Sequence, residues 1–192
     1  MIDTNYLISI FFLLLGISVI IRNYELKKYS SFFWFCDFAP FLFIIGFFFN
    51  NIQFLKAIIS VGLIGQIIAL FNVLPSRIAK WNRDKTSYRT FYIFSDILLH
   101  LTTIMVLILT FSFPPEIESI KYSFFILVVM FFATLIFTPK NENVNTIYYS
   151  EINSKNKKSR FKLPFHTVLW IFYGLIVVSI TYLIQYLLYL YI

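Results

Sequence analysis

Six long apolar stretches alternate with short polar segments along this chain. A helix needs about 20 apolar residues to cross a bilayer, within a range of about 17–25. Residues 1–192 therefore predict one all-α domain, a polytopic membrane protein built as a bundle of six transmembrane helices. The expected spans are 5–21, 31–49, 52–74, 90–113, 121–138 and 164–190.

Prolines stand at or near several ends of these spans. We expect Pro75 to end the third span, because proline has no amide hydrogen for the helix ladder. The pair Pro114–Pro115 and the single Pro139 are expected to end the fourth and fifth spans. Pro164 suits the first turn of the sixth helix. Pro40 lies inside the second span and predicts a kink that frees a backbone carbonyl.

Composition supports the same class. Of the 192 residues, 59% are hydrophobic and only 13% are charged, about half of the roughly 25% typical of soluble domains. The chain has no nucleotide-binding glycine motif, no CxxC and no HExxH. These absences argue against nucleotide-driven transport by this chain alone. The single cysteine, Cys36, excludes an intramolecular disulfide.

Basic residues are concentrated in every second loop. The segments 22–30, 75–89 and 139–163 hold 14 of the 16 Lys and Arg, and only Lys56 and Lys121 lie elsewhere. The positive-inside rule places these loops in the cytoplasm and both termini outside, and we expect a bacterial inner membrane. Membrane lipids are the expected partners, and no motif points to nucleic acid. A second copy or another membrane partner stays open.

Small residues single out the third span. Gly62 and the spacing Gly65-x-x-x-Ala69 favour close approach of neighbouring helices. We therefore expect this helix to pack at the centre of the bundle.

Three ionisable residues lie inside the apolar segments: Asp37, Asp96 and His100. A carboxylate in hydrocarbon costs at least about 2.5–3.5 kcal/mol on insertion scales, so it usually faces a cavity, a partner or a substrate path. In the expected orientation both aspartates lie about six residues, or about 9 Å, inside the cytoplasmic face. His100 follows Asp96 by four residues and shares its helix face. If the second, third and fourth spans adjoin, these residues form one site in the cytoplasmic leaflet.

Neighbouring polar residues are candidates for substrate binding. Thr103 extends the face of His100 by one turn, and Gln66 reaches a similar depth on the third span. Asn72 lies close to the expected cytoplasmic mouth. We expect Gln66, Asn72 and Thr103 to contact the substrate.

Several chemistries fit these residue types. Asp96 can hold the His100 imidazole in one tautomer, which makes His100 a general base. Cys36 is then the candidate nucleophile, and Asp37 a second acid or base. Alternatively, the two aspartates and His100 can bind a divalent metal or relay protons. They can also simply join helices. Interhelical polar contacts, however, average only about 0.6 kcal/mol, which offsets little of the free energy needed to insert two carboxylates.

The sequence Trp34-Phe35-Cys36-Asp37, with His100-Leu101 and Asn143-Val144-Asn145, resembles a group of uncharacterised bacterial six-span membrane proteins. A histidine often stands in that group at the position of Asp37, which implies an ionisable group rather than a fixed catalytic role. The layout is also similar to the androgen-induced family of intramembrane hydrolases, which carry a nucleophile on an early helix and a histidine on a later one. The resemblance implies that His100 matches that histidine. The early threonine of that family has no clear counterpart here, so Cys36 would have to substitute for it.

The expected function is a lipid- or acyl-directed hydrolase or transferase that works from the cytoplasmic leaflet. His100, Asp96, Asp37 and Cys36 are its expected catalytic residues, and the sequence assigns no resident metal and names no cofactor. A small proton-coupled transporter or channel is the first alternative. Its weakness is that little polar sequence links the outer residues Lys56 and Gln185 inward. The second alternative is an accessory subunit that docks through the basic loops.

Overall fold

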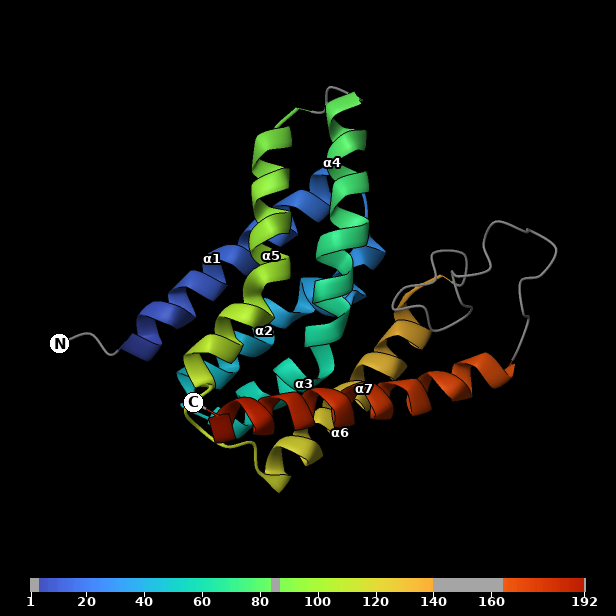
Figure 1. Ribbon diagram of the computed structural model, residues 1–192. Coiled ribbons are helices and arrows are strands. Elements are labelled where there is room, and N and C mark those ends of the chain that lie inside the picture. Colours follow the sequence, from blue (N-terminus) through green and yellow to red (C-terminus); the bar gives the residue numbers. More distant parts are fainter. Residues whose placement is uncertain (1–3, 84–86, 140–163, 192) are drawn as a thin grey trace.

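The computed structural model of the protein describes residues 4–83, 87–139 and 164–191, and every regular element in this part of the chain is helical (Figure 1). The elements are α1 (Thr4–Glu25), the 3₁₀ helix η1 (Tyr29–Phe33), α2 (Phe35–Phe48), α3 (Ile52–Ile68), the π-helix η2 (Ala69–Val73), α4 (Leu74–Arg83), α5 (Arg89–Thr110), α6 (Ile117–Phe137) and α7 (Pro164–Tyr191). Five helical stretches are long and apolar enough to cross a membrane, and α2 is a shorter apolar helix. The predicted helical membrane bundle is confirmed.

The first helix runs past its expected end. It continues to Glu25, so Arg22 and Asn23, which the charge pattern assigned to a loop, belong to α1. Buried residues recur along α1 every three or four positions, as in a helix with one face against its neighbours. Arg22 and Asn23 continue that buried face after Val19.

The second helix begins later than expected. Residues Tyr29–Phe33 form η1, in which the amide of Trp34 donates to the carbonyl of Ser31 at 3.0 Å. The turn that enters η1 requires a positive φ of 51° at Lys27. Asp37 is consequently the third residue of α2 rather than about six residues into it. With 14 residues, α2 is about 21 Å long, shorter than the roughly 30 Å hydrocarbon core.

The prediction that Pro75 ends the third helix is wrong. The helical chain continues from Ile52 through Arg83. Ahead of the proline the helix widens into η2, where the amide of Leu74 donates to the carbonyl of Ala69, five residues back. Pro75 is then the second residue of α4, a first-turn position at which the missing amide hydrogen is tolerated. The continued helix contains Arg77, which contacts Asp96 of α5.

The remaining helices follow the apolar pattern more closely. α5 ends at Thr110 before the Pro114–Pro115 pair, and α7 covers the expected sixth span. α6 starts at Ile117, earlier than expected, and its first turn is charged and largely exposed. There the Lys121 amine lies 3.8 Å from a Glu118 carboxylate oxygen, one turn away.

Helix α3 forms the centre of the bundle, as expected. It packs against α2, α5, α6 and α7, and its residues Ile58 and Ile59 are fully buried. The predicted contacts of the small residues Gly62 and Gly65 account for only part of this packing. A Cβ on Gly62 would lie 2.2 Å from a ring carbon of Phe35, so Gly62 does create close packing with α2. Gly65 faces open space, with nothing within 4 Å of its Cβ position.

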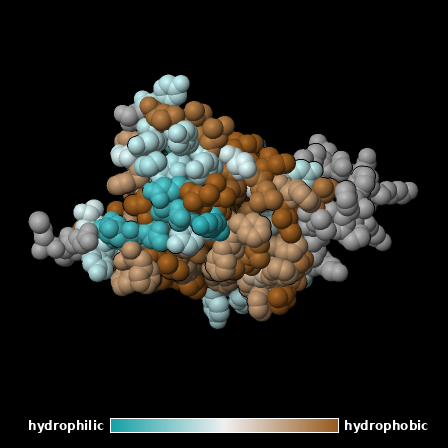
Figure 2. All heavy atoms as spheres, turned by 90° about the horizontal axis from the view of Figure 1, so that it is seen from below, coloured by the Kyte–Doolittle hydropathy of each residue, from teal (hydrophilic) through white to brown (hydrophobic). Residues whose placement is uncertain are grey.

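The outer surface of the bundle is largely apolar. Figure 2 shows, from below the view of Figure 1, many hydrophobic residues, one strongly hydrophilic patch and weakly hydrophilic residues around it. Large side chains such as Leu14, Phe125 and Ile136 are more than half exposed. A surface of this kind matches hydrocarbon rather than water, so these faces contact membrane lipid.

Candidate functional site

Arg22 of α1 joins the two buried aspartates. Its Nη2 atom donates to Asp37 Oδ1 of α2 at 2.8 Å, and its Nη1 atom donates to Asp96 Oδ1 of α5. Arg22 and Asp37 are each 3% exposed, and Asp96 is completely buried. The planar guanidinium presents several donors in a fixed fork, which suits it to hold two carboxylates at once. Asp37 and Asp96 therefore do meet in one layer, as the sequence predicts.

Two further residues complete this charged network, which we define as Arg22, Asn23, Asp37, Arg77 and Asp96. Arg77 of α4 donates to Asp96 Oδ2 at 3.0 Å, and Asn23 of α1 donates to Asp37 Oδ2 at 2.8 Å. Each of the four carboxylate oxygens thus accepts a hydrogen bond. Two positive and two negative charges balance within the network. That balance matters because a buried charge without a partner is far more costly than a paired one.

Sequence reasoning missed both arginines. Arg22 and Arg77 were assigned to cytoplasmic loops because they stand beside the apolar stretches. One signal was available for Arg22, since it continues the three-to-four spacing of the buried face of α1. A second signal was electrostatic, because two carboxylates in hydrocarbon require nearby cations. Nothing in the apolar pattern indicated that the helix would pass Pro75 and present Arg77.

His100 lies beside this network but is held differently from the prediction. Its Nδ1 atom lies 2.7 Å from the backbone carbonyl oxygen of Asp96, one turn earlier on α5. The hypothesis that the Asp96 carboxylate orients the ring needs correction, because that carboxylate binds Arg22 and Arg77. A carbonyl only accepts hydrogen bonds, so Nδ1 carries the proton. In the neutral ring this leaves Nε2 with the lone pair that a base requires.

Cys36 lies at the opposite edge of the network. It is the second residue of α2, with its sulfur 3.8 Å from Asp37 Oδ1 and its side chain half-buried. The first amides of a helix have no acceptor within the helix and favour negative charge nearby. Pro40, four residues later, has no amide hydrogen to donate to the Cys36 carbonyl. The backbone around Cys36 therefore offers both donors and an acceptor.

Cys36 and His100 share an electrostatic environment. The Cys36 sulfur lies 3.8 Å from Asp37 Oδ1, and His100 Nδ1 lies 2.7 Å from the Asp96 carbonyl oxygen. Arg22 joins these two aspartates, and Arg77 also binds Asp96. The two groups come from α2 and α5, which pack against each other as well as against α3. The assumption that the second, third and fourth spans adjoin is confirmed by these contacts.

The three expected substrate-binding residues do not gather in one place. Gln66 of α3 hydrogen-bonds Thr103 of α5, and the Thr102 hydroxyl lies 3.2 Å away. With its amide nitrogen turned toward α5, Gln66 also donates to the His100 carbonyl at 3.2 Å. Gln66 and Thr103 therefore continue the site one turn beyond His100. Asn72 lies apart, exposed on the π turn.

A second buried polar cluster lies where α3 begins and α7 ends. Gln185 of α7 donates to the Ser60 hydroxyl at 2.7 Å and to the Lys56 carbonyl at 3.3 Å, and Thr181 donates to the Ser60 carbonyl. Lys56 is fully buried, and within the described chain its Nζ atom has no partner. The Gln185 Oε1 atom is likewise unbonded there. These outer residues therefore form a polar cluster of their own, and whether polar groups link it inward stays a prediction.

The Asp37 and Asp96 carboxylates bind arginine side chains and are not arranged as metal ligands. Among the described residues, no three His, Cys, Asp or Glu side chains come together as a metal site. This geometry argues against the metal alternative for Asp37, Asp96 and His100. The described residues give no donor set that would identify a cofactor.

Further basic residues lie close to the charged network. Partial burial, followed by the nearby Arg77, Lys80 and Arg22, lowers the pKa of Lys28. Lys28 follows α1 directly, since its amide donates to the Asn23 carbonyl at 2.9 Å. With Arg22 and Arg77 already matched by two aspartates, Lys28 and Lys80 add positive charge beside the network. An anionic group is therefore favoured near these two lysines.

Comparison with known proteins identifies one family. No curated protein and no solved structure matches the chain. A family model does match, over residues 2–189, and it describes the TMEM164 family of membrane proteins. The matched range includes every described helix except the last residues of α7, and it includes the whole charged network together with Cys36 and His100. The chain belongs to the TMEM164 family.

Proposed function

We propose that this protein is a membrane-embedded acyl hydrolase or acyltransferase that acts on a lipid ester from the cytoplasmic leaflet. Cys36 is the nucleophile and His100 the general base. One observation carries the proposal: the Cys36 sulfur of α2 lies 3.8 Å from Asp37 Oδ1, and the His100 ring of α5 lies 2.7 Å from the Asp96 carbonyl oxygen, so both groups adjoin the charged network. Acyl transfer requires at least a nucleophile and a base, and here they stand on the neighbouring helices α2 and α5. The similarity in layout to intramembrane hydrolases supports the same chemistry.

The aspartates take positioning roles in this proposal. Both carboxylates are occupied by arginine, so neither is free to exchange protons with a substrate. Asp96 fixes α5, whose backbone carbonyl in turn holds the His100 ring. An unpaired carboxylate 3.8 Å from the Cys36 sulfur would oppose the formation of a thiolate. Arg22 reduces this repulsion because it neutralises the charge of Asp37. Gln66 and Thr103 are then placed to contact the substrate beyond His100.

The proposed reaction begins when His100 Nε2 takes the proton of the Cys36 thiol. The sulfur attacks the ester carbonyl carbon, and the carbon–oxygen bond to the leaving alcohol breaks. His100 returns the proton to that alcohol, which leaves an acyl thioester on Cys36. Water, or a second alcohol in a transferase, attacks the thioester while His100 takes its proton and returns it to the sulfur. The products are an acid or a new ester, and the free thiol.

Orientation in the membrane belongs to the same proposal. The bias of basic residues favours a cytoplasmic position for the turn at 22–30 and the loops 75–89 and 139–163, with both termini outside in a bacterial inner membrane. The last of these loops lies almost wholly outside the described residues, as does Asn143-Val144-Asn145. In this orientation Lys28 faces the cytoplasmic headgroups. Anionic lipids and fatty-acid products are attracted to it.

Replacing Cys36 by Ala tests the proposed nucleophile. The purified protein is reconstituted into vesicles of a bacterial lipid extract, and released fatty acid or transferred acyl chain is measured by mass spectrometry. We expect the wild type to turn over phospholipid ester and Cys36→Ala to fall to the background of empty vesicles. The control is Lys27→Gln, an exposed change in the turn between α1 and η1, which is expected to retain turnover. Full activity in Cys36→Ala would remove Cys36 from the mechanism.

A proton-coupled transporter is the second candidate, favoured by the buried Lys56 cluster. α3 carries Lys56, Ser60 and Gln66, three buried polar residues that approach the charged network from the far end of the helix. A proton path needs such groups at both ends of the membrane. If the protein conducts protons, Lys56→Met should reduce pH-driven proton uptake into vesicles at least about tenfold. Equal uptake in Lys56→Met and in wild type, at the level of empty vesicles, would exclude this candidate.

A further inference from the structure

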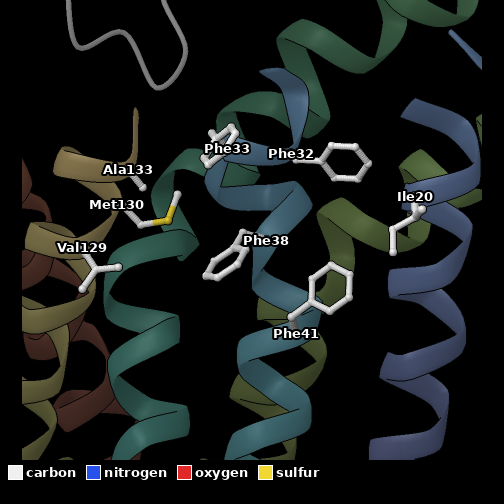
Figure 3. A pocket seen from close by; sticks show the side chains of 8 residues that line it. All are labelled: Ile20, Phe32, Phe33, Phe38, Phe41, Val129, Met130 and Ala133. Atoms are coloured by element: carbon white, nitrogen blue, oxygen red, sulfur yellow. The ribbon is translucent and has the colours of Figure 1, made fainter. Parts of the chain in front are cut away.

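We infer that a groove on the lipid-facing side of α2 is a binding site for one acyl chain of an anionic phospholipid, separate from the proposed substrate site. The groove has a volume of about 520 Å³. Figure 3 shows Phe38 and Phe41 of α2 as its floor, between Ile20 of α1 and the α6 side chains Val129, Met130 and Ala133. This inference does not depend on the proposed catalysis.

The groove arises from the way α2 is packed. α1 lies along α2 with Gly16 facing the Phe41 ring, and a Cβ at Gly16 would lie 2.9 Å from that ring. α6 packs instead on α3 and reaches η1, so α2 is set back between its two neighbours. At one end, Phe33 of η1 stacks on Phe137 of α6 with ring centroids 5.5 Å apart. That aromatic pair closes the groove next to the turn that contains Lys27.

The lining of the groove selects an apolar occupant. All eight lining side chains are apolar. A polar ligand would lose its hydrogen bonds to water there without replacement. Several rim residues are exposed to the surrounding lipid, such as Ile20 at 44% and Val129 at 42%. A lipid chain therefore enters sideways from the bilayer.

Charge at the closed end selects an anionic headgroup. Lys27 and Lys28 immediately precede η1, which forms that end of the groove. A basic residue near a membrane surface strengthens binding of an acidic lipid by about fivefold. The acyl chain in the groove is distinct from the substrate of the proposed reaction. Cys36 lies two residues before Phe38, so the two side chains point about 160° apart around α2. A lipid held on this face packs against the same helix without approaching the thiol.

Native mass spectrometry of the purified full-length protein tests this site. The protein is incubated in detergent with equal amounts of dioleoyl phosphatidylglycerol and dioleoyl phosphatidylcholine. We expect one phospholipid to remain bound to the wild type, mostly phosphatidylglycerol. Ala133→Phe should fill the groove and lower the bound fraction at least about fivefold, and Val129→Phe serves as a second filling variant if the first does not fold. Leu183→Phe, on the exposed face of α7 outside the groove, should retain the lipid.

A further variant tests whether the two lysines select an anionic lipid. Lys27→Gln with Lys28→Gln should keep a bound lipid but bring phosphatidylglycerol and phosphatidylcholine to nearly equal amounts. Unchanged lipid retention in both filling variants would overturn the inference, and so would a wild type that keeps no lipid. A dimer mass that disappears in Ala133→Phe would assign the groove to a second copy of the chain and would overturn it as well.

Discussion

Replacing Arg22 by Gln is expected to lower the free energy of unfolding by about 3–5 kcal/mol, because it leaves two buried carboxylates with a single remaining cation between them. Asp37 loses its only ion-pair partner among the described residues, and Asp96 keeps only Arg77. Loss of a cation that joins three helices should also loosen the packing of α1 on α2 and α5. Thermal unfolding in detergent, followed by loss of the monodisperse peak in size-exclusion chromatography, measures the change.

A matched control and a rescue separate this effect from a general loss of charge. Lys27→Gln removes a positive charge from the same turn region at an exposed position, and should change stability by less than about 0.5 kcal/mol. Adding Asp37→Asn and Asp96→Asn to Arg22→Gln removes the buried negative charges and should recover part of the lost stability. If Arg22→Gln and Lys27→Gln unfold at the same temperature, the charged network does not hold these helices together.

Replacing His100 by Ala is expected to reduce acyl turnover by about 10²–10⁴-fold, the usual contribution of a positioned general base. The ring is 1% exposed and its Nδ1 proton is directed to the Asp96 carbonyl, so Nε2 is the ring atom that acts as the base in the proposed reaction. Single-turnover kinetics on vesicle lipid measures the change. The maximal rate should fall, whereas binding of lipid to the vesicle-embedded protein should not.

Two further variants show whether His100 acts as a base. His100→Gln keeps a polar side chain of similar length but cannot accept a proton, so its rate should match that of His100→Ala. Added imidazole should partly restore the rate of His100→Ala, because the small base can enter the space that the ring leaves. Wild-type turnover in His100→Gln would show that the side chain only joins helices.

Hydrophobic patterning predicted the bundle well, because each apolar stretch must become a helix whose backbone bonds are satisfied within the membrane. It erred where local hydrogen bonding departs from a regular helix. The 3₁₀ turn before α2 moved Asp37 into a first turn, and the π turn before Pro75 extended the third helix through Arg83. Neither departure changes the hydrophobicity of the segment, so neither was visible in the pattern.

The candidate site was predicted in outline and misjudged in detail. Asp37, Asp96 and His100 do lie together, because all three had to leave the lipid for a shared polar interior. The predicted roles of the two carboxylates did not include Arg22 and Arg77 as partners. A positive residue at the end of an apolar stretch can be either a loop charge or a buried ion-pair partner. Only the lateral packing of α1, α4 and α5 distinguishes these two uses.

Trapping an acyl-enzyme shows whether Cys36 accepts an acyl group beside the charged network. The protein in lipid vesicles is incubated briefly with a phospholipid carrying isotopically labelled acyl chains, quenched in acid and digested for mass spectrometry. We expect a labelled acyl group on Cys36 that hydroxylamine removes, as it removes thioesters, and none in Cys36→Ala. Turnover of the labelled phospholipid with no acyl group on Cys36 at any time during the reaction would show that Cys36 is not the nucleophile.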